Sequence, residues 1–363
     1  MTGTLDMPHA AWSPASSASP APALTALRAL RRDSSARLFL QPFAPWMDDD
    51  AVTEICVNAE GLVWVERDSK WECHALPAID LALMEALATS VATFSNQIIN
   101  RKNPLLSSSL PDGSRIQVVM PPAVEHFPSF TLRKPSRKTR SLEDFEADGL
   151  FAAVTPRQTA LSPSDLKLKH LQANGQIKEF LKLAVVAKKN IVVSGATGSG
   201  KTTFMKGLVF EIPREERLIT IEDVRELFLP QPNAVHLLYS KGDQGAAKVT
   251  PKDLLHACLR MKPSRILMAE LRGEECLDYL QTAASGHPGS ITSMHAGSPA
   301  LAFERMAMMV QGGEAGQSMS FDVVKRLLTL TVDIVVQFQN DYGHRYISEI
   351  HFQPEDALRV TQS

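Results

Sequence analysis

A glycine-rich segment that follows an apolar run has the residue types and spacing of a phosphate-binding loop. Its residues are Gly195, Ala196, Thr197, Gly198, Ser199, Gly200, Lys201, Thr202 and Thr203. Glycines let the backbone turn its N–H groups inward around a phosphate, and a helix that starts near Lys201 adds the positive end of its dipole. We expect Lys201 to lie between the β- and γ-phosphates and the Thr202 hydroxyl to bind Mg²⁺. The alternative is a Gly/Ser-rich loop that contains Lys-Thr by chance.

Two further segments place carboxylates directly after apolar strands. Residues 265–269 end in Glu270, and residues 218–221 end in Glu222 and Asp223. Hydrolysis of a bound triphosphate requires carboxylates at neighbouring strand ends, which manage the metal ion and the attacking water. Glu270 is the candidate ligand of Mg²⁺ through water, or the residue that polarises the attacking water. Which of Glu222 and Glu270 orients the water stays open, and each could instead be a solvated acid at a strand end.

Two histidines surround a short apolar run at residues 290–294, each beside glycine or another small residue. Such surroundings indicate a backbone packed closely on a ligand or a subunit. We therefore predict His295 as a sensor of the γ-phosphate and hold His287 as a weaker candidate. A metal site is not expected here, because no third ligand lies at a suitable spacing.

Length, charge and cysteine content restrict the class of protein. The chain has 363 residues, 44% of them apolar, which predicts two domains, and its net charge of -2 provides no overall basic field for nucleic acid. The four cysteines have no Cys-x-x-Cys spacing and are interpreted as small buried side chains in a reducing compartment. No apolar run is long enough to span a membrane and no secretory signal is visible. A cytoplasmic protein is expected.

Composition divides the chain into four parts. Residues 1–22 are rich in Ala, Pro and Ser and predict a disordered leader. A smaller α+β N-terminal domain is expected over 23–140, a charged linker over 141–175 and the nucleotide-binding domain over 176–363. Residues 23–32 predict a short basic amphipathic helix, which either packs on the first domain or contacts an anionic membrane surface.

Strands and helices alternate in the C-terminal part, which predicts an α/β fold with a mostly parallel sheet. A final pair of strands, 332–336 and 345–351, is expected to extend this sheet in antiparallel fashion. The other predicted strands cover 190–194, 218–221, 265–269 and 290–294, and the predicted helices cover 175–188, 201–210, 250–261, 273–284 and 299–309.

The N-terminal part shows short strands punctuated by turns around one amphipathic helix, predicted over 79–99. A hairpin is expected at Pro111-Asp112-Gly113. The predicted strands are 54–58, 62–66, 71–75, 116–120 and 130–133.

Taken together, the motifs resemble those of the secretion ATPase superfamily, in which a Walker A loop, an Asp box, a Glu-bearing Walker B segment and a His box follow in this order. The segments that carry the resemblance are 195–202, 219–223, 259–266, 269–273 and 286–296. Within the superfamily the chain is most similar to the hexameric traffic ATPases of bacterial type IV secretion and conjugation systems. Residues 110–115 and 130–136 match that branch, and the four-cysteine zinc module of the type II branch is missing from the sequence.

The resemblance implies a RecA-like P-loop domain that hydrolyses ATP with Mg²⁺ in a homo-hexamer. Arg115 and Arg133 of the first domain would then reach the phosphates as arginine fingers, unless they are solvated strand residues. Arg260 and Arg272 are candidates for contacts between subunits. The long linker raises the hypothesis that the first domain packs on the adjacent subunit. Expected partners are other ATPases and inner-membrane components of a secretion apparatus, with the protein peripheral to the bacterial inner membrane.

The sequence leaves two other functions open besides a motor for substrate transfer or pilus biogenesis. The first is a ring scaffold that binds nucleotide and turns it over negligibly. The second is a nucleic-acid translocase of similar core, although the near-neutral charge and the missing stripe of aromatic and basic residues argue against direct DNA binding.

Overall fold

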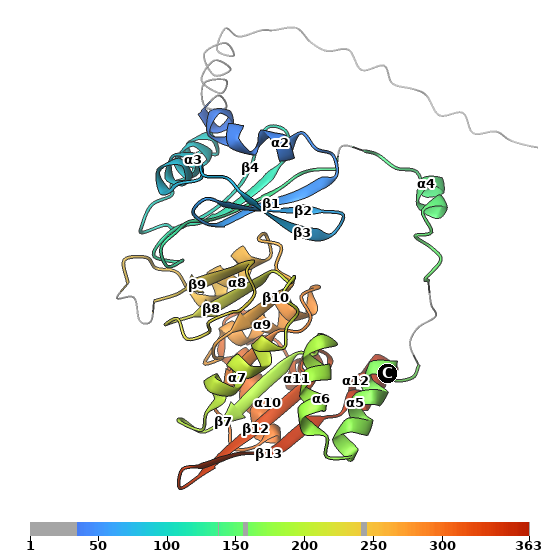
Figure 1. The fold of residues 1–363 in the computed structure, drawn as a ribbon. Helices are drawn as coiled ribbons and strands as arrows, with labels where there is room; N and C mark the ends of the chain where they lie inside the picture. Colours follow the sequence, from blue (N-terminus) through green and yellow to red (C-terminus); the bar gives the residue numbers. More distant parts are fainter. Residues whose placement is uncertain (1–34, 137, 155–158, 241–244, 363) are drawn as a thin grey trace, which may run out of the picture.

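The strands of the protein form two separate sheets, drawn one above the other in Figure 1. The structure is a computed structural model that describes residues 35–136, 138–154, 159–240 and 245–362. The predicted leader over 1–22 and the predicted helix over 23–32 lie outside the described residues. Within the described ranges, no helix combines the length and the apolar character needed to cross a membrane.

The first sheet is antiparallel, with six strands in the order β3-β2-β1-β6-β5-β4. A helix, α3, covers one of its faces and begins where the Asp80 carboxylate accepts the N–H of Leu83. The elements are η1 (Gln41–Phe43), α2 (Ala44–Met47), β1 (Val52–Ala59), β2 (Leu62–Arg67), β3 (Lys70–Ala75), α3 (Leu81–Phe94), β4 (Leu105–Ser109), β5 (Arg115–Val119) and β6 (Ser129–Arg133).

Side chains alternate along β1 between an apolar face and a polar face. Ile55 and Val57 join the apolar core beneath α3, whereas Glu54, Cys56 and Asn58 point to the opposite face. Glu54 and Cys56 are nevertheless buried. The polar face is therefore covered by another part of the chain.

The second sheet has seven strands in the order β13-β12-β7-β11-β10-β8-β9. All neighbouring strands from β12 to β9 run parallel, and only β13 is antiparallel. The strands are β7 (Ile191–Gly195), β8 (Leu218–Glu222), β9 (Ala234–Leu238), β10 (Arg265–Met268), β11 (Ile291–Met294), β12 (Ile334–Asp341) and β13 (His344–Phe352).

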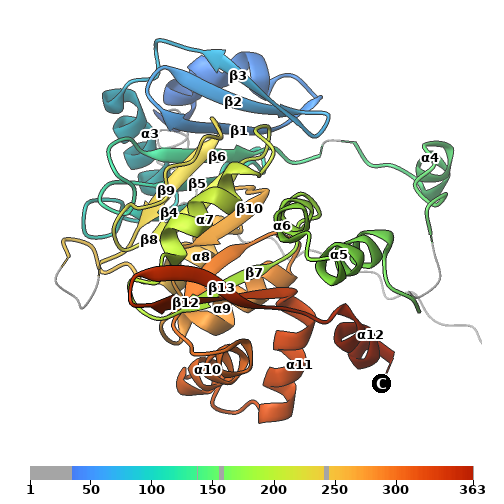
Figure 2. The same ribbon diagram turned by 60° about the horizontal axis from the view of Figure 1, so that its bottom comes forward.

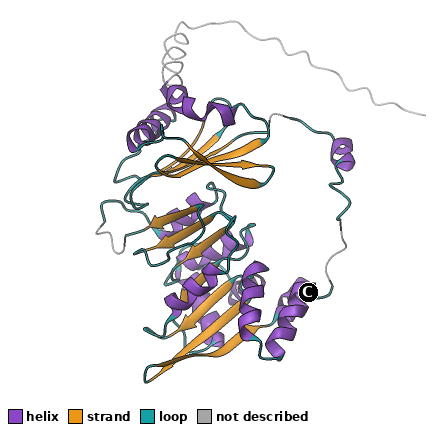
Figure 3. Cartoon of the chain, viewed as in Figure 1, coloured by secondary structure: helices purple, strands orange, loops and turns teal. Residues whose placement is uncertain are grey.

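Helices cover both faces of the second sheet, as Figure 3 shows. Ile191 and Val193 of β7 pack in one core with α5, α6 and α7, whereas Val192 packs in the core of the other face with α8 to α11. The helices are α5 (Pro163–Ala173), α6 (Ile177–Val186), α7 (Lys201–Phe210), α8 (Pro251–Cys258), α9 (Glu275–Ala284), α10 (Pro299–Gly312), α11 (Phe321–Thr331) and α12 (Pro354–Gln362).

The polar face of the first sheet docks on the second sheet near β8 and β9. At the centre of this interface the buried guanidinium of Arg217 donates to Asn58, at 3.1 Å, and to the Met261 carbonyl, at 2.9 Å. Further along β9, the N–H of Leu238 donates to the carbonyl of Ala123 at 2.9 Å. These contacts join the two sheets within one chain.

The connection between the two sheets carries one isolated helix, α4 (Leu142–Ala147), none of whose residues is buried. Figures 1 and 2 both show α4 standing away from the two sheets. The predicted linker over 141–175 contains α4, but its last part, α5, packs on α6 and belongs to the second sheet's core through Leu168.

Most predicted elements are observed, with several differences. The predicted helix over 79–99 is shorter, because α3 ends at Phe94 and Asn96 has a positive φ of 55°. β12 runs parallel to β7, so only β13 is an antiparallel extension. β9, α11 and α12 were not predicted. Cys56, Cys258 and Cys276 are buried as expected, but Cys73 is exposed on β3, the edge strand of the first sheet.

Candidate nucleotide site

The glycine-rich loop joins β7 to α7 and lines a cavity of about 360 Å³. Gly198 and Gly200 have φ of 73° and 99°, a conformation that glycine adopts without a Cβ penalty. Gly200 is the N-cap of α7 and supplies no capping side chain, so the first N–H groups of the helix remain available to an anion. The cavity is lined by residues 197–203 and by Asp223, Glu226, Ala269, Glu270, Arg272, Ser293, His295 and Arg345.

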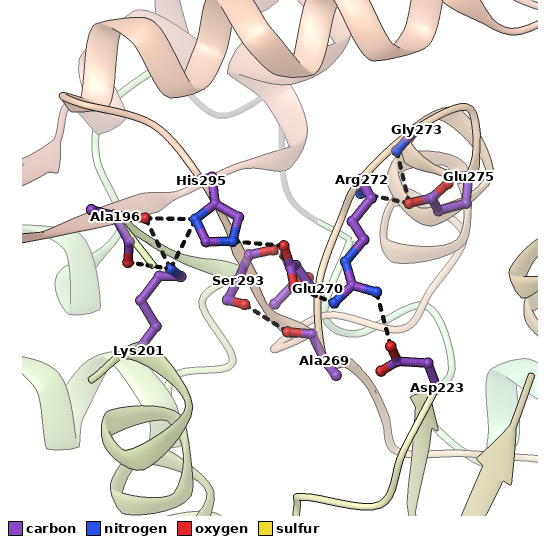
Figure 4. A network of polar contacts seen from close by, with 12 residues as sticks. Ala196, Lys201, Asp223, Ala269, Glu270, Arg272, Gly273, Glu275, Ser293 and His295 are labelled. Atoms are coloured by element: carbon purple, nitrogen blue, oxygen red, sulfur yellow. Dashed lines mark hydrogen bonds and ion pairs between the residues drawn. The ribbon is translucent and has the colours of Figure 1, made fainter. Parts of the chain in front are cut away.

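The ammonium group of Lys201 points into the loop, as Figure 4 shows. It donates to the carbonyls of Gly195 and Ala196, both at 2.9 Å, and lies 3.3 Å from Nδ1 of His295. Burial lowers the pKa of Lys201, and the nearby Glu270 carboxylate opposes this effect. The charge of Lys201 is thus held inside the phosphate cradle by oxygen and nitrogen acceptors of the same chain.

His295 connects Lys201 to the carboxylate at the end of β10. Its Nε2 lies 3.0 Å from Oε1 of Glu270, and its Nδ1 also lies 3.1 Å from the Gly195 carbonyl. A neutral imidazole that donates from Nε2 to Glu270 presents Nδ1 as an acceptor for Lys201. The contacts with Lys201 and Glu270 fit the Nε2–H tautomer, whereas the Gly195 carbonyl would be matched by a proton on Nδ1 instead.

Arg272 binds the other oxygen of Glu270. Its guanidinium donates to Oε2 of Glu270 at 2.6 Å and to Asp223 at 2.9 Å. The hydrogen bond with Glu270 and the bond with Asp223 raise the pKa of Arg272 above its ordinary value. Figure 4 shows the resulting row of contacts from Lys201 through His295, Glu270 and Arg272 to Asp223.

Glu222 does not line the cavity, unlike Glu270, the other candidate for orienting the attacking water. Its side chain is fully buried, and its Oε2 accepts the N–H groups of Glu226 and Leu227 at 2.8 and 2.9 Å. Burial alone would raise its pKa, but contacts with His236 and these two amides bring the pKa of Glu222 below its usual range. Glu222 stabilises the turn after β8, and its neighbour Asp223 faces the cavity instead.

His287 and His295 lie at opposite ends of strand β11. His287 precedes β11, whereas His295 follows it, and a strand of this length separates the two ends by roughly 13 Å. Its Nδ1 lies 3.1 Å from the Pro263 carbonyl, and burial lowers its pKa. The structure therefore assigns His287 a packing role and leaves His295 at the cavity.

Arg115 and Arg133 are Cα partners on the neighbouring strands β5 and β6, so they share one face of the first sheet. Neither lines the cavity at the P-loop. Arg133 instead borders a second cavity, of about 480 Å³, together with Glu54 and Lys262. Arg260 is exposed at the end of α8, away from the P-loop cavity. Within one chain, the two arginines of the first domain do not meet the phosphate-binding loop.

Two residues of the cavity were missed by sequence reasoning. Glu226 follows the turn that Glu222 stabilises, so only the tertiary structure brings it to the cavity. Arg345 lies on β13, about 140 positions from the loop in sequence. No motif surrounds Arg345, and its proximity depends on the pairing of β12 with β7.

Comparisons with known proteins agree with the geometry. The family model for type II/IV secretion system proteins matches residues 40–340. The chain is 49% identical over 333 residues to the type IV secretion system protein VirB11 of Brucella suis biovar 1 (strain 1330), an alignment that covers 90% of this chain and 92% of that protein. It is 42% identical over 315 residues to the type IV secretion system protein PtlH homolog of Bordetella bronchiseptica, covering 86% and 92%.

A solved structure also matches over nearly the whole fold. It is the crystal structure of the VirB11 ATPase from the Brucella suis type IV secretion system in complex with sulphate. The TM-score is 0.89 at 47% identity, and the match covers 93% of this chain and 100% of that one. The chain therefore belongs to the type II/IV secretion system protein family, in its branch of type IV secretion traffic ATPases.

Proposed function

We propose that the protein is an Mg²⁺-dependent ATPase motor that powers substrate transfer or pilus biogenesis in a type IV secretion system. The observation that carries this proposal is the uninterrupted row of contacts from Lys201 through His295 to Glu270 beside the phosphate cradle. Such a row can report a γ-phosphate at Lys201 to a carboxylate that faces the same cavity. Family membership supports a secretion ATPase, and the site supports hydrolysis as its chemistry.

The residues of the cavity take distinct roles in this proposal. The amides of residues 198–203 hold the phosphates, and Lys201 exchanges its carbonyl partners for phosphate oxygens. Thr202 and, through water, Glu270 would hold Mg²⁺, which neutralises charge developing on the phosphates. Both residues line the one cavity, so a hydroxyl and a carboxylate suited to Mg²⁺ are present together. Glu270 orients the attacking water, and His295 senses the γ-phosphate.

We further propose that the site is completed in a homo-hexamer by arginines of another subunit. Arg115 and Arg133 lie side by side on the first sheet but reach no residue of the P-loop cavity in their own chain. The extended connection around α4 leaves the first sheet docked near β8 and β9 rather than at the loop. In a head-to-tail ring, that sheet can present the two arginines to the nucleotide of a neighbour. Association with the cytoplasmic side of the inner membrane follows from the role in secretion.

Loss of ATP hydrolysis in Lys201→Ala is the direct test. The variant removes the ammonium group from the cradle, and we expect turnover to fall to background together with nucleotide affinity. Lys206→Ala is the matched control, because Lys206 is exposed on the same helix and does not line the cavity. Phosphate release by Lys201→Ala at the parental rate would refute the proposal.

Mixing two inactive variants tests the composite site. Lys201→Ala lacks the cradle and Arg133→Ala lacks the proposed finger, so a mixed ring contains some sites with one intact residue of each kind. We expect the mixture to recover part of the parental activity. A mixture as inactive as its components shows that both residues act from the same chain, whereas parental activity of Arg133→Ala alone shows that Arg133 has no role in hydrolysis.

A further inference from the structure

The C-terminal hairpin of the second sheet delivers a guanidinium to the phosphate-binding loop. Arg345 is the second residue of β13, paired with Asn340 of β12, and it lines the P-loop cavity. A Cβ placed on Gly200 would lie 3.4 Å from Cδ of Arg345, so the arginine stem passes directly over the N-cap of α7. Figure 2 shows the hairpin reaching out beside the start of α7.

The position of this hairpin is fixed by the same sheet that carries the loop. β12 pairs in parallel with β7, and Phe338 is the Cα partner of Gly195, the first residue of the loop. The ring of Phe338 also packs against Phe204 of α7, with ring centroids 4.9 Å apart. The hairpin and the loop therefore form one rigid unit, and the base of the Arg345 side chain is held in place by strand pairing.

Unlike the other two cations described at the cavity, Lys201 and Arg272, Arg345 has a guanidinium that is available to bind a ligand. Lys201 is engaged by two carbonyls and His295, and Arg272 is engaged by Glu270 and Asp223. Among the residues that the structure describes, none forms a hydrogen bond or an ion pair with the Arg345 side chain. The residue is exposed at the mouth of the cavity. A guanidinium in this position can bind phosphate oxygens in a bidentate manner without giving up an existing partner.

We propose that Arg345 is a nucleotide-binding residue that acts within its own chain on the α- and β-phosphates. Amides of a P-loop cradle the α- and β-phosphates, whereas its lysine reaches toward the γ-phosphate. Arg345 meets the loop at Gly200, and the contacts of Lys201 lead away toward His295 and Glu270. Arg345 therefore supports binding of ADP and ATP alike. This inference rests on the nucleotide site proposed above.

Equilibrium binding of ADP and of a non-hydrolysable ATP analogue to full-length Arg345→Gln tests the role. A hydrogen bond to a charged group contributes about 1.5 kcal/mol or more, so we expect both dissociation constants to rise by about tenfold and by the same factor. KM for ATP rises accordingly, while kcat stays within about twofold because Glu270 and His295 are untouched. Arg345→Lys keeps the charge without the planar fork and retains part of the affinity.

Arg359→Gln is the matched control, since Arg359 is an exposed arginine on α12 that does not line the cavity. Unchanged ADP affinity in Arg345→Gln overturns the inference, and so does a loss confined to the ATP analogue, which would assign the group to the γ-phosphate. Failure of the nucleotide site itself is distinguishable, because the parental protein and Lys201→Ala would then bind ADP equally poorly. Thermal unfolding of Arg345→Gln at the parental temperature shows that the fold is intact.

Discussion

Nε2 of His295 lies 3.0 Å from Oε1 of Glu270, across the carboxyl ends of the adjacent parallel strands β11 and β10. Because Nδ1 of the same ring lies 3.3 Å from Lys201, a single imidazole links the phosphate-binding lysine to the carboxylate. In the mechanism that we propose, a phosphate that attracts Lys201 would change the partners of His295, and His295 would in turn reorient Glu270. This relationship would couple the nucleotide state to Glu270, the group that we propose for water activation.

Glu270→Gln should abolish turnover and leave nucleotide binding intact. The amide keeps the size of the side chain but can no longer accept a proton or pair fully with Arg272 and His295. We expect kcat to fall by about 10²- to 10⁴-fold, the usual contribution of a general base. Steady-state phosphate release and binding of an ATP analogue measure the two effects.

The control for this prediction is Glu304→Gln, which changes an exposed glutamate on α10 paired with Lys325. Turnover of Glu270→Gln at the parental rate would contradict the assigned role. Equal, negligible turnover in both variants and the parent would favour a nucleotide-gated scaffold.

Gly195→Ala should weaken the packing between β7, which carries the phosphate-binding loop, and the hairpin of β12 and β13. The added Cβ would lie 2.8 Å from the Phe338 carbonyl oxygen and 2.9 Å from Ser199 Oγ, closer than atoms pack without movement. We expect the free energy of unfolding to fall by about 1–3 kcal/mol, the usual cost of overpacking. Chemical denaturation gives the change.

Gly207→Ala, inside the following helix α7, should change stability in the opposite direction, because its new Cβ meets nothing within 4 Å. An alanine inside a helix gains about 0.5–1 kcal/mol relative to glycine. If both variants shift stability in the same direction, contact with Phe338 is not what selects glycine at position 195.

Glu54→Gln should change how stability depends on pH. The Glu54 carboxyl is 2% exposed, and its Oε2 has no hydrogen-bond partner among the described residues. Burial is the main cause that raises the pKa of Glu54 to about 7, and the nearby Glu66 carboxylate also raises it. The positive charges of Lys262, Arg133 and Arg217 lower the pKa but do not outweigh burial. The folded state thus binds a proton that the unfolded state releases near pH 4.5.

The sign follows from proton linkage. The stabilisation is fully present below the unfolded pKa and is lost as pH rises through about 7. Since one pKa unit corresponds to about 1.4 kcal/mol, ionised Glu54 costs the fold up to about 3 kcal/mol. Glu54→Gln should flatten the unfolding profile between about pH 5 and 8 and raise stability at the alkaline end. Glu85→Gln, on the exposed side of α3, should leave the profile as it is.

Arg217→Met should weaken the docking of the first sheet on the second. The fully buried guanidinium donates to Asn58, Asn233 and the Met261 carbonyl, and it packs 5.6 Å from the ring of Trp71. Methionine fills similar space but removes this donor, so that the Met261 carbonyl loses its bond to the guanidinium and Asn233 keeps only the side-chain amide of Asn58, at 2.9 Å. A buried acceptor left without a partner costs about 1–3 kcal/mol. We expect a lower unfolding temperature and faster hydrogen exchange in β1 and β9.

Arg214→Met changes an exposed arginine in the same region and serves as the control. Parental hydrogen exchange in β1 and β9 of Arg217→Met would show that other contacts, such as Leu238 with Ala123, are sufficient to hold the sheets together.

Local sequence determined the phosphate-binding loop and the strand and helix on either side. An apolar run, glycines and Lys-Thr lie within thirteen residues, 191–203, and the predicted helix over 201–210 is the observed α7. The position of Glu270 after β10 was likewise predictable, because one strand carries it to the sheet edge. Helix α11 was not predicted, although the sequence indicates it: Ser320 is a typical N-cap residue and is followed by an amphipathic run.

Only the tertiary structure decided which of several similar residues face the nucleotide cavity. Sequence placed Glu222 and Asp223 at one strand end, but backbone amides of the turn after β8 hold the first, and the second faces the cavity. Arg345 approaches Gly200 because β12 pairs with β7, and Arg133 stays away because the first sheet docks near β9. The spacing of a motif specifies contacts between residues that are close in the sequence. Contacts between distant segments depend on strand order, on side-chain direction and on which groups must be satisfied when buried.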